Sequence, residues 1–516
     1  MSLRPYPCVL WYLLAAGIAA AQTVEIDRQP ITVTTSTETN VRWKVVREAG
    51  VVLQVVDASG RARRTIEAGR LAPGEYHARV DGQGLAAGQY RLRVGVNPRA
   101  EADLSFGVNG MLGVLSKKVM FRGERKIDLG ATGADPQQVT VKVDGEDWAR
   151  VDSLTVAGSN FVFSSTTGAI ELNPAVPLAE GAEIAATYPA GLLLENPWEV
   201  QTAPDGSVCI GDALGPVDSF YKRAKLRTDR IYKVDAAGKP VTSFGANGVL
   251  ETRMSDLAVG RDGNVYVSRD HHVVVFGPRG DPKYIVAGYI DPYRPGAHAY
   301  EGGYWIRSIA LDDAGTMLIV NGNGSNLIYD PSKTNFDGFV AMQTSREGAM
   351  WPPIYGMNWG PCAAIQGSCF YTTTQWSSLV KYRFDREKKQ FATVWATPVY
   401  EPGYEAHPSV PGSLRHAMGI VLDGSGLIYV ADHTNHRVQV FFDAGETYKF
   451  VASLGAVNQM QAPHAVALAP DGQSLYVADD GAFYPLTENL FVKGLSRVTK
   501  LKLGFQETIE VPMEVK

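Results

Sequence analysis

Short apolar runs separated by glycine turns recur from about residue 196 onward. The clearest example is "GIVLDGSGLIYVAD" at residues 419–432, where two apolar runs flank a turn of small residues. β-Branched and aromatic residues dominate such runs, so we expect strands rather than helices. Successive positions within each run are apolar, which is typical of strands buried on both faces. The pattern therefore predicts short strands sandwiched between neighbouring sheets.

The strand–turn–strand pattern occurs six times. The spacing between copies is roughly 50 residues, close to that of four-stranded propeller blades. Six copies predict six blades. The copies lie at residues 203–212, 260–270, 312–322, 364–373, 423–432 and 469–479, and their turn glycines are Gly206, Gly263, Gly315, Gly367, Gly426 and Gly472.

The fifth copy resembles the NHL-repeat family of β-propellers. The stretch "GIVLDGSGLIYVADHTNHRVQVF" follows that family's pattern of G-I-A-V-D, then G-x-I-Y-V-A-D-x-x-N-x-R-V-Q-V-F, and "APHAVALAPDGQSLYVAD" resembles its first half. The resemblance covers residues 196–505 and implies a six-bladed NHL-type β-propeller. It also implies that Asp432 and Asn435 bind backbone amides, that Arg437 pairs locally, and that His433 and His436 are structural.

Two further β-rich modules are expected upstream of the propeller. Residues 30–97 alternate strands with Gly/Pro turns and resemble the immunoglobulin-like domain of FlgD-type proteins, through the residues Asp57, Gly60, Arg61, Gly88 and Tyr90. That resemblance implies a small β-sandwich. Residues 98–190 form a second β-rich module of unknown type. The predicted fold class is therefore all-β, a six-bladed β-propeller preceded by two small β-sandwich-like modules.

The first residues have the pattern of a secretory signal. Arg4 precedes the apolar run "VLWYLLAAGIAA", and "AAAQ" offers a cleavage site after Ala21. Residues 1–21 are therefore predicted to be a signal peptide, and no later segment is apolar enough to cross a membrane after its removal. We expect an exported bacterial protein, secreted or periplasmic.

Charge and cysteine content narrow the functional classes. The net charge is −5 and no basic block occurs, which argues against a nucleic-acid partner. Cys362 and Cys369 flank a predicted hairpin, so a cross-strand disulfide is expected in an oxidising compartment. Cys209 lies within an apolar strand and is expected to be a buried thiol. The C-x6-C spacing is a poor zinc motif.

Long connections are expected on one face of the propeller, opposite the glycine turns. Long loops commonly carry function, so this face is the predicted binding face. Its loops are rich in aromatic residues, which either form a stacking platform for a sugar or peptide or pack loop against loop. These residues are Tyr289, Tyr293, Tyr300, Tyr304, Trp305, Trp351, Tyr355, Tyr400 and Tyr404.

The residue that enters the first strand of each blade should line the central channel. Aligning the copies on their glycines gives one such residue per blade, with Tyr355 as the alternative to Trp359 in the fourth. His416 lies two residues before Met418, so the alternation of a strand places it on the same side. Arg307, His416 and His464 then converge at one end of the channel. The aligned positions are Trp198, Ser255, Arg307, Trp359, Met418 and His464.

Two of these histidines suggest an alternative, catalytic function. His464 in "APHAVAL" resembles a zinc-binding position of the amidating lyases, NHL-like propellers in which "P-H" histidines from three blades hold the metal and an arginine assists. His416 resembles that pattern in a shifted register, and Arg307 would bind a substrate anion. A third histidine is missing from the aligned positions, and catalytic zinc normally has three protein ligands. A loop histidine, His298 or His407, would have to complete the site.

Calcium is disfavoured in the channel because the aligned positions contain no carboxylate or carboxamide. Glu199 and Asp256 are each one residue further along and should point the other way. Two hypotheses remain. The first is an exported recognition protein without a cofactor that binds a peptide, glycan or protein partner through Trp198, Arg307, Tyr355, Trp359, His416 and His464. The second is a zinc-dependent lyase or hydrolase with His416 and His464 as metal ligands and Arg307 and His464 as catalytic residues.

Overall fold

The structure is a computed structural model of the 516-residue chain. It describes residues 22–106, 114–129, 136–164, 169–189, 194, 197–213, 229–246, 248–269, 272–286, 306–312, 314–321, 326–329, 339–342, 363–373, 378–385, 387, 390–398, 410–415, 417–455, 460–479, 482–483, 492–493 and 497–516. The predicted signal peptide lies outside these residues, as do all the loop aromatic residues named above.

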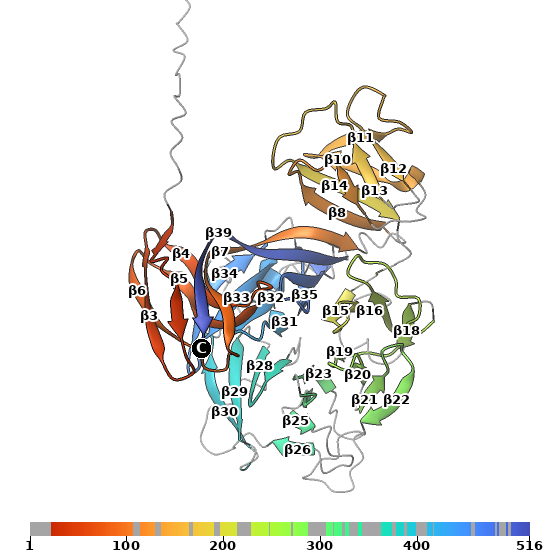
Figure 1. Ribbon diagram of the computed structural model, residues 1–516. Coiled ribbons are helices and arrows are strands. Elements are labelled where there is room, and N and C mark those ends of the chain that lie inside the picture. Colours follow the sequence, from red (N-terminus) through yellow and green to blue (C-terminus); the bar gives the residue numbers. More distant parts are fainter. Residues whose placement is uncertain are drawn as a thin grey trace, which may run out of the picture.

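The C-terminal part of the chain forms five four-stranded antiparallel sheets and three strands of a sixth blade, which together are the predicted blades (Figure 1). Five of them use four consecutive strands each. Blade 1 has β15 (Pro197–Thr202), β16 (Val208–Ala213), β17 (Asp229–Val234) and β18 (Val249–Thr252); blade 2 has β19 (Asp256–Val259), β20 (Val265–Arg269), β21 (His272–Phe276) and β22 (Pro282–Val286); blade 3 has β23 (Ile306–Leu311), β24 (Met317–Asn321), β25 (Asn326–Tyr329) and β26 (Phe339–Met342). Blade 4 has β27 (Ala363–Gln366), β28 (Cys369–Thr373), β29 (Leu379–Asp385) and β30 (Gln390–Ala396), and blade 5 has β31 (Ala417–Leu422), β32 (Leu427–Asp432), β33 (Arg437–Asp443) and β34 (Tyr448–Leu454).

The innermost strands of the blades close into a ring. Each inner strand contacts the inner strands of the blades before and after it, and β15 of blade 1 contacts β35 (Pro463–Leu468) of blade 6. The chain is therefore all-β with a closed six-bladed propeller, as the repeat predicted. The six turn glycines all have positive φ, from 61° at Gly367 to 119° at Gly426, which explains why glycine recurs there.

Blade 4 corrects the expected disulfide. Its inner hairpin pairs Gln366 with Cys369, so only Gly367 and Ser368 form the turn. Cys369 thus faces Gln366 rather than Cys362 across the hairpin, and its thiol is free in this structure. Cys362 itself lies outside the described residues. Cys209 is a fully buried free thiol, as expected.

Blade 6 is completed by a strand from the N-terminal half of the chain. Its sheet order is β35, β36 (Ser474–Asp479), β39 (Arg497–Val515) and β7 (Gly88–Phe106). The outermost strand of the last blade therefore comes from residues that precede the propeller in sequence. β39 and β7 pair antiparallel along nearly their whole length, from Val498 opposite Phe106 to Val515 opposite Gly88.

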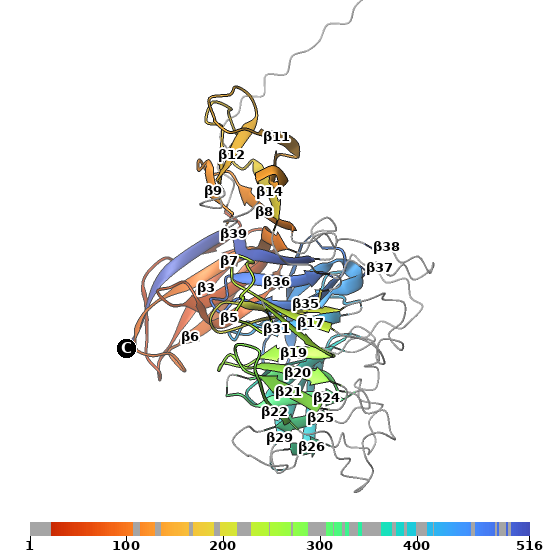
Figure 2. The same cartoon turned by 90° about the vertical axis from the view of Figure 1, so that its right-hand side faces the viewer.

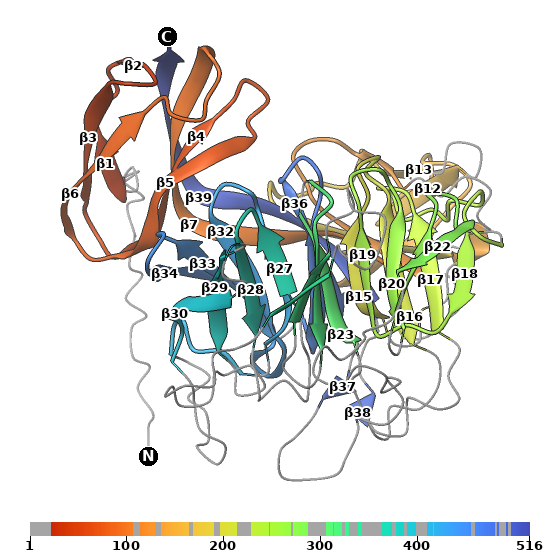
Figure 3. The ribbon, with the colours of Figure 1, turned by 90° about the horizontal axis from the view of Figure 1, so that it is seen from below.

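The other half of this long ribbon belongs to an N-terminal β-sandwich. One sheet contains β4 (Ala49–Val56), β5 (Ala62–Leu71), β7 and β39, with β2 (Ile31–Val33) parallel to the end of β39. The facing sheet contains β1 (Val24–Ile26), β3 (Glu38–Val45) and β6 (Gly74–Asp81). Figure 3 shows β39 and β7 running from the propeller into the sandwich. The structure does not identify the sandwich as a FlgD-type domain.

A separate β module stands above the propeller (Figure 2). It follows β7 in the chain, and its sheet order from β7 is β8-β14-β10-β11-β12-β13-β9. Its core is built around buried aromatic and aliphatic residues such as Phe161, Ile170, Leu172 and Tyr188. The strands are β8 (Val114–Met120), β9 (Lys126–Asp128), β10 (Thr140–Val143), β11 (Glu146–Arg150), β12 (Asn160–Ser164), β13 (Ala169–Leu172) and β14 (Glu183–Pro189).

The sandwich also packs directly against blade 5. Val52 and Ala68 share an apolar cluster with residues of β32 and β33. Beside them the hydroxyls of Thr65 and Ser425 are 2.8 Å apart, and the Thr65 N–H donates to the Ser425 carbonyl (2.9 Å). Buried polar groups that satisfy each other hold one docking geometry. The sandwich is thus fixed to the propeller by a shared ribbon and by a packed contact.

No helix within the described residues is long and apolar enough to cross a bilayer.

Candidate functional site

Four inner strands carry a β-bulge at the same place, where the strand enters the sheet. The pairing shifts between residues 197 and 199 in β15, 306 and 308 in β23, 417 and 419 in β31, and 463 and 465 in β35. A bulge adds an unpaired residue and re-aims its side chain. The added residues are Trp198, Arg307, Met418 and His464, four of the positions that the sequence alignment placed at the channel entry.

Acidic residues at the ends of the second strands hold these entry segments. Asp479 is opposite Pro463, and its carboxylate accepts the N–H groups of Gln461 and Ala462, both at 2.7 Å. Asp432 is opposite Ala417 and accepts the N–H of Arg415 at 2.6 Å. Both carboxylates are buried. The Asp of each "YVAD" motif therefore fixes the backbone just before the bulge.

Asp432 is the centre of the polar network that the NHL resemblance implied. Its Oδ2 atom accepts hydrogen bonds from Asn435 Nδ2 (2.9 Å), Arg437 Nε (2.9 Å) and Gln439 Nε2 (2.7 Å). Burial raises the pKa of Asp432, and these donors together with the Arg415 N–H oppose that rise. Asn435 therefore contacts the Asp432 side chain, whereas the resemblance implied a backbone amide.

His464 lies among aromatic groups from three blades. Its Nδ1–H donates to the carbonyl oxygen of Trp198 in blade 1 (2.8 Å), and the two ring centroids are 3.5 Å apart. His433, which follows β32 in blade 5, meets the His464 ring edge-on with centroids 6.2 Å apart. His464 and His433 are buried, whereas Trp198 is half-buried. Trp198 is thus the most exposed member of this cluster.

The remaining predicted residues are only partly placed. The backbone of Arg307 is described in β23 but its side chain is not. Tyr355, Trp359 and His416 lie outside the described residues, so the expected meeting of His416 with His464 is not observed. Ser255 begins the inner hairpin of blade 2, where its N–H donates to the Ser268 carbonyl (2.9 Å).

The structure also brings together two carboxyl groups that sequence reasoning had set aside. Glu199 of β15 is hydrogen-bonded to Asp256 of β19, in the neighbouring blade. Asp256 Oδ2 also accepts the N–H of Ile309 in blade 3 (2.7 Å), and its Oδ1 accepts the Leu257 N–H (2.7 Å). The pair therefore links the inner strands of three blades.

Burial controls the protonation of this pair. It raises the pKa of Glu199 well above the usual value, and the nearby Asp256 charge raises it further. Burial also raises the pKa of Asp256, whereas its donors, Ser308, Ile309 and Leu257, lower it. Two buried carboxyls in contact cannot both ionise without strong repulsion. Burial and mutual repulsion therefore favour a protonated form of the pair, and they act most strongly on Glu199.

The pair makes stability pH-dependent. Because the Glu199 pKa is higher in the folded than in the unfolded chain, the protonated group stabilises the fold below about pH 4.5, the unfolded value. That contribution is lost as pH rises toward the folded pKa, with a slope of at most about 1.4 kcal/mol per pH unit. Glu199→Gln should flatten this fall. Urea unfolding between pH 5 and pH 8 measures it, with Glu251→Gln, which alters a largely exposed side chain, as control. Parallel profiles for wild type and Glu199→Gln would contradict the assignment.

The opposite end of the channel, beside the glycine turns, contains a cavity of about 410 Å³. All six inner strands contribute to its wall, which is largely aliphatic. One residue from each strand illustrates this: Gln201, Val259, Leu311, Gln366, Leu422 and Val466. The two ends of the channel therefore differ, with aromatic and titratable groups at one end and aliphatic groups at the other.

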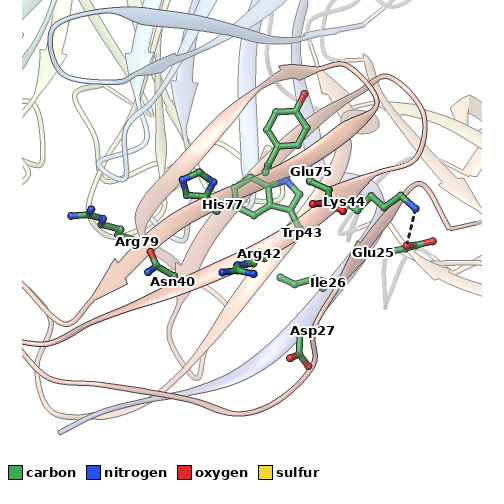
Figure 4. Close-up of a pocket in the computed structure, with 11 residues that line it drawn as sticks. Glu25, Ile26, Asp27, Asn40, Arg42, Trp43, Lys44, Glu75, His77 and Arg79 are labelled. Carbon is green, nitrogen blue, oxygen red and sulfur yellow. Dashed lines mark ion pairs between the residues drawn. The ribbon is translucent and has the colours of Figure 1, made fainter.

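A broad hollow of about 850 Å³ also covers the outer face of the β1-β3-β6 sheet. Figure 4 shows charged side chains of both signs along it, including Asp27, Arg42 and Arg79, and the ion pair between Lys44 and Glu25. Both members of that pair are more than half exposed. This mixture is typical of a solvated sheet face.

Metal ligands are incomplete within the described part of the chain. No group of three or more His, Cys, Asp or Glu side chains there is arranged to hold an ion. His464 satisfies one requirement of a ligand, because its Nδ1–H bond to a carbonyl orients the ring, as happens in metal-bound histidines.

Comparison with known proteins identifies one repeat. The family model for the NHL repeat matches residues 414–441, which comprise the end of the entry segment and most of the first three strands of blade 5. Together with the closed ring of blades, the match defines this chain as a β-propeller protein that carries an NHL repeat. A comparison with curated protein sequences finds no match.

Solved structures show only distant likeness. An auxiliary nutrient binding protein from Bacteroides ovatus is 11% identical, with a TM-score of 0.37, and the alignment covers 94% of this chain and 98% of that one. Its counterpart from Bacteroides thetaiotaomicron is 9% identical, with a TM-score of 0.38 and the same coverage. A protein from Lactobacillus plantarum is 14% identical, with a TM-score of 0.38, over 64% of this chain and 96% of that one. Likeness at this level carries no argument about function.

Proposed function

We propose that this protein is an exported bacterial recognition protein, secreted or periplasmic, that binds a peptide, glycan or protein partner at the bulge-bearing end of its propeller channel. The observation that supports the proposal is the set of four equivalent bulges, which lie at the same end of their inner strands and contain Trp198, Arg307, Met418 and His464. A regular ring of inner strands does not need such bulges, and bulges are enriched beside binding sites.

Trp198 is the proposed anchor of the ligand. Its indole is half-buried and rests on His464, which holds the Trp198 carbonyl and so fixes the backbone. A rigid aromatic face that is partly exposed suits stacking on a sugar ring or on an apolar peptide side chain. His464 then acts as a positioning residue rather than as the contact itself.

Glycan and peptide arrays probed with labelled protein test this function. Trp198→Ala should weaken binding to any retained glycan or peptide by about tenfold or more, because central aromatic anchors dominate such contacts. The matched control is Tyr284→Ala, which removes an exposed aromatic ring from β22 at the edge of blade 2 and should leave binding unchanged. Equal binding by wild type and Trp198→Ala would place the site elsewhere.

A zinc-dependent lyase or hydrolase is the second candidate. The Nδ1–H bond of His464 favours it, because it leaves Nε2 as the coordinating nitrogen of a neutral imidazole. His416 would be the second ligand, and Arg307 would bind the anionic part of a substrate. Zinc would polarise a substrate oxygen or activate water at this end of the channel.

Metal content distinguishes the two candidates. If the second is right, purified protein should contain stoichiometric zinc that is lost in His416→Ala and His464→Ala but retained in His77→Ala, which alters an exposed histidine of the sandwich. Folded wild-type protein that contains no zinc after growth in zinc-supplemented medium would exclude the lyase and leave the recognition protein.

A further inference from the structure

A second pocket lies where the sandwich meets the propeller, and we call it the junction pocket. Its volume is about 450 Å³. One wall is the outer face of β4, β7 and β39 together with the β4–β5 turn. The other wall comes from blades 5 and 6, including residues of their glycine turns. The pocket lies beside the glycine turns and not at the bulge-bearing end, so it is independent of the function proposed above.

Four arginines line the junction pocket: Arg61, Arg91, Arg93 and Arg99. Arg91 and Arg93 share one carboxylate, that of Glu510, at 3.1 and 3.0 Å. A Cβ atom placed on Gly60 would lie 3.4 Å from Arg93 Nη2 and 3.9 Å from Arg91 Nη2. Both guanidinium groups therefore lie against the residue that precedes Arg61.

The β4–β5 turn holds Arg61 at this place. Asp57 Oδ1 accepts the N–H groups of Ser59 (2.9 Å) and Arg61 (3.1 Å), and Gly60 has a φ of 86°. The hydroxyl of Ser59, the N–H of Arg61 and the Arg63 side chain lower the pKa of Asp57 against the effect of burial, so a carboxylate holds the turn at neutral pH. Among the described residues, no acceptor bonds the Arg61 guanidinium. The β4–β5 turn thus brings to the pocket a guanidinium group that no acceptor within the described residues occupies.

Two aspartates on the propeller wall do not neutralise this charge. The Asp423 carboxylate forms hydrogen bonds within the glycine turn of blade 5. Its Oδ1 atom accepts the N–H groups of Ser425 (2.7 Å), Gly426 (3.0 Å) and Leu427 (2.9 Å). Burial raises the pKa of Asp423, and the hydrogen bonds from Ser425, Leu427 and Gly426 oppose that rise. Asp471 accepts the N–H of Gln473 within the blade 6 turn (2.8 Å). Neither forms an ion pair with an arginine of the pocket within the described residues.

The rest of the sandwich side is partly apolar. Pro98, Leu503 and Phe505 line it and are half-buried. The Phe505 ring packs directly on the backbone of Gly95. A Cβ atom at that position would lie 2.4 Å from ring atoms, so only glycine leaves room for the ring. Guanidinium groups beside a partly apolar wall are the arrangement expected for a ligand with an anionic head and an apolar body.

We propose that the junction pocket binds a small organic oxyanion, a carboxylate or a phosphate attached to an apolar group, with Arg61 as its direct ligand and Arg91 and Arg93 as supporting charges. Arg91 and Arg93 share the single carboxylate of Glu510, and within the described residues no acceptor bonds the Arg61 guanidinium, so this wall of the pocket has more guanidinium groups than carboxylates paired with them. A planar guanidinium compensates this charge best with a two-oxygen anion. Glu510 acts as the internal counter-ion that a ligand would join or displace.

Calorimetric titration of the full chain at constant ionic strength tests the site. The probes are phenyl phosphate, benzoate and neutral benzamide. Wild type should bind phenyl phosphate, benzoate or both with a Kd of about 1 mM or tighter, and benzamide at least tenfold more weakly. Binding of one anion alone names the head group, and binding of both establishes a general oxyanion site.

Three variants distinguish arginines that bind the anion from arginines that have only a structural role. Arg61→Gln should weaken anion binding at least tenfold, and Arg79→Gln, which alters a largely exposed arginine on the other sheet of the sandwich, should not change it. Glu510→Gln should tighten binding, because it removes the competing internal carboxylate; arginines with only a structural role would not produce this gain. If wild type binds neither anion, binds benzamide equally well, or binds as Arg61→Gln does, the proposal fails. The Arg61→Gln and Arg79→Gln pair decides the matter even if Glu510→Gln does not fold.

Discussion

Replacing Val511 with Asp is expected to unfold the N-terminal sandwich. Val511 is fully buried in β39, opposite Leu92 of β7, within the apolar core between the two sheets. An unpaired carboxylate there carries a penalty of several kcal/mol, a large fraction of the stability of a typical domain. Because the same ribbon forms the two outer strands of blade 6, protection should also fall at that blade.

Hydrogen exchange measured along the chain checks this expectation. Loss of protection should extend from the sandwich strands into residues 98–106 and 497–505. Thr508→Asp is the matched control, since Thr508 is an exposed residue of the same strand and surface changes usually alter stability by no more than about 0.5 kcal/mol. A Val511→Asp protein with wild-type protection would show that the sandwich does not depend on the C-terminal strand.

Asp432→Ala is expected to have the largest effect of any single change in the NHL repeat. The substitution removes the buried carboxylate that accepts from the guanidinium of Arg437 and the amide of Gln439, and leaves them the neutral carbonyl of Ser413 as acceptor. Removing one partner of a buried ion pair typically destabilises a protein by about 3–5 kcal/mol. The free energy of unfolding from urea titration measures this loss.

An exposed ion pair in the neighbouring blade provides the comparison. Arg383 and Glu446 pair across blades 4 and 5 with side chains 50% and 77% exposed, so Glu446→Ala should alter the free energy of unfolding by at most about 1 kcal/mol. Similar losses for Asp432→Ala and Glu446→Ala would mean that the buried network does not stabilise the blade.

The repeat made the propeller predictable from sequence. Each blade is a local unit in which an apolar strand, a turn at positive φ and a second apolar strand follow within about a dozen residues. Local pairing needs no knowledge of distant segments. The same regularity located Trp198, Met418 and His464, because the distance from the turn glycine to the bulge is constant in those blades.

In blade 4, alignment of the copies on their turn glycines does not predict which residues pair across the hairpin. Its inner hairpin has a turn of Gly367 and Ser368 alone, whereas blade 1 has residues 203–207 between the paired Thr202 and Val208. Alignment on the turn glycines assumes that all the hairpin turns have the same length. Two predictions depended on the turn length of blade 4, which the sequence does not reveal: the position of Trp359 and the disulfide between Cys362 and Cys369. Register is set by the turn, and a change in turn length shifts every cross-strand partner.

Alternation within single strands also failed to predict the acidic pair. It placed Glu199 and Asp256 away from the channel entry, each on its own blade. Whether two such side chains meet depends on the spacing and twist between blades, which no periodicity within one strand encodes. The sequence did contain one indication of this contact. Glu199 and Asp256 each follow the aligned entry residue of their blade by one position, so the two carboxyl groups occupy equivalent places in neighbouring blades.

The amino-acid sequence by itself determined the all-β class, the six blades, the polar network around Asp432 and four of the positions where the inner strands bulge, because all of these arise from contacts between near neighbours in the chain. The tertiary structure alone decided that β7 closes the last blade, that β39 belongs to two domains, that Glu199 meets Asp256 and that Arg61 faces a pocket. Those contacts join segments tens to hundreds of residues apart, and long-range pairing is fixed by the packing of the whole chain rather than by local pattern.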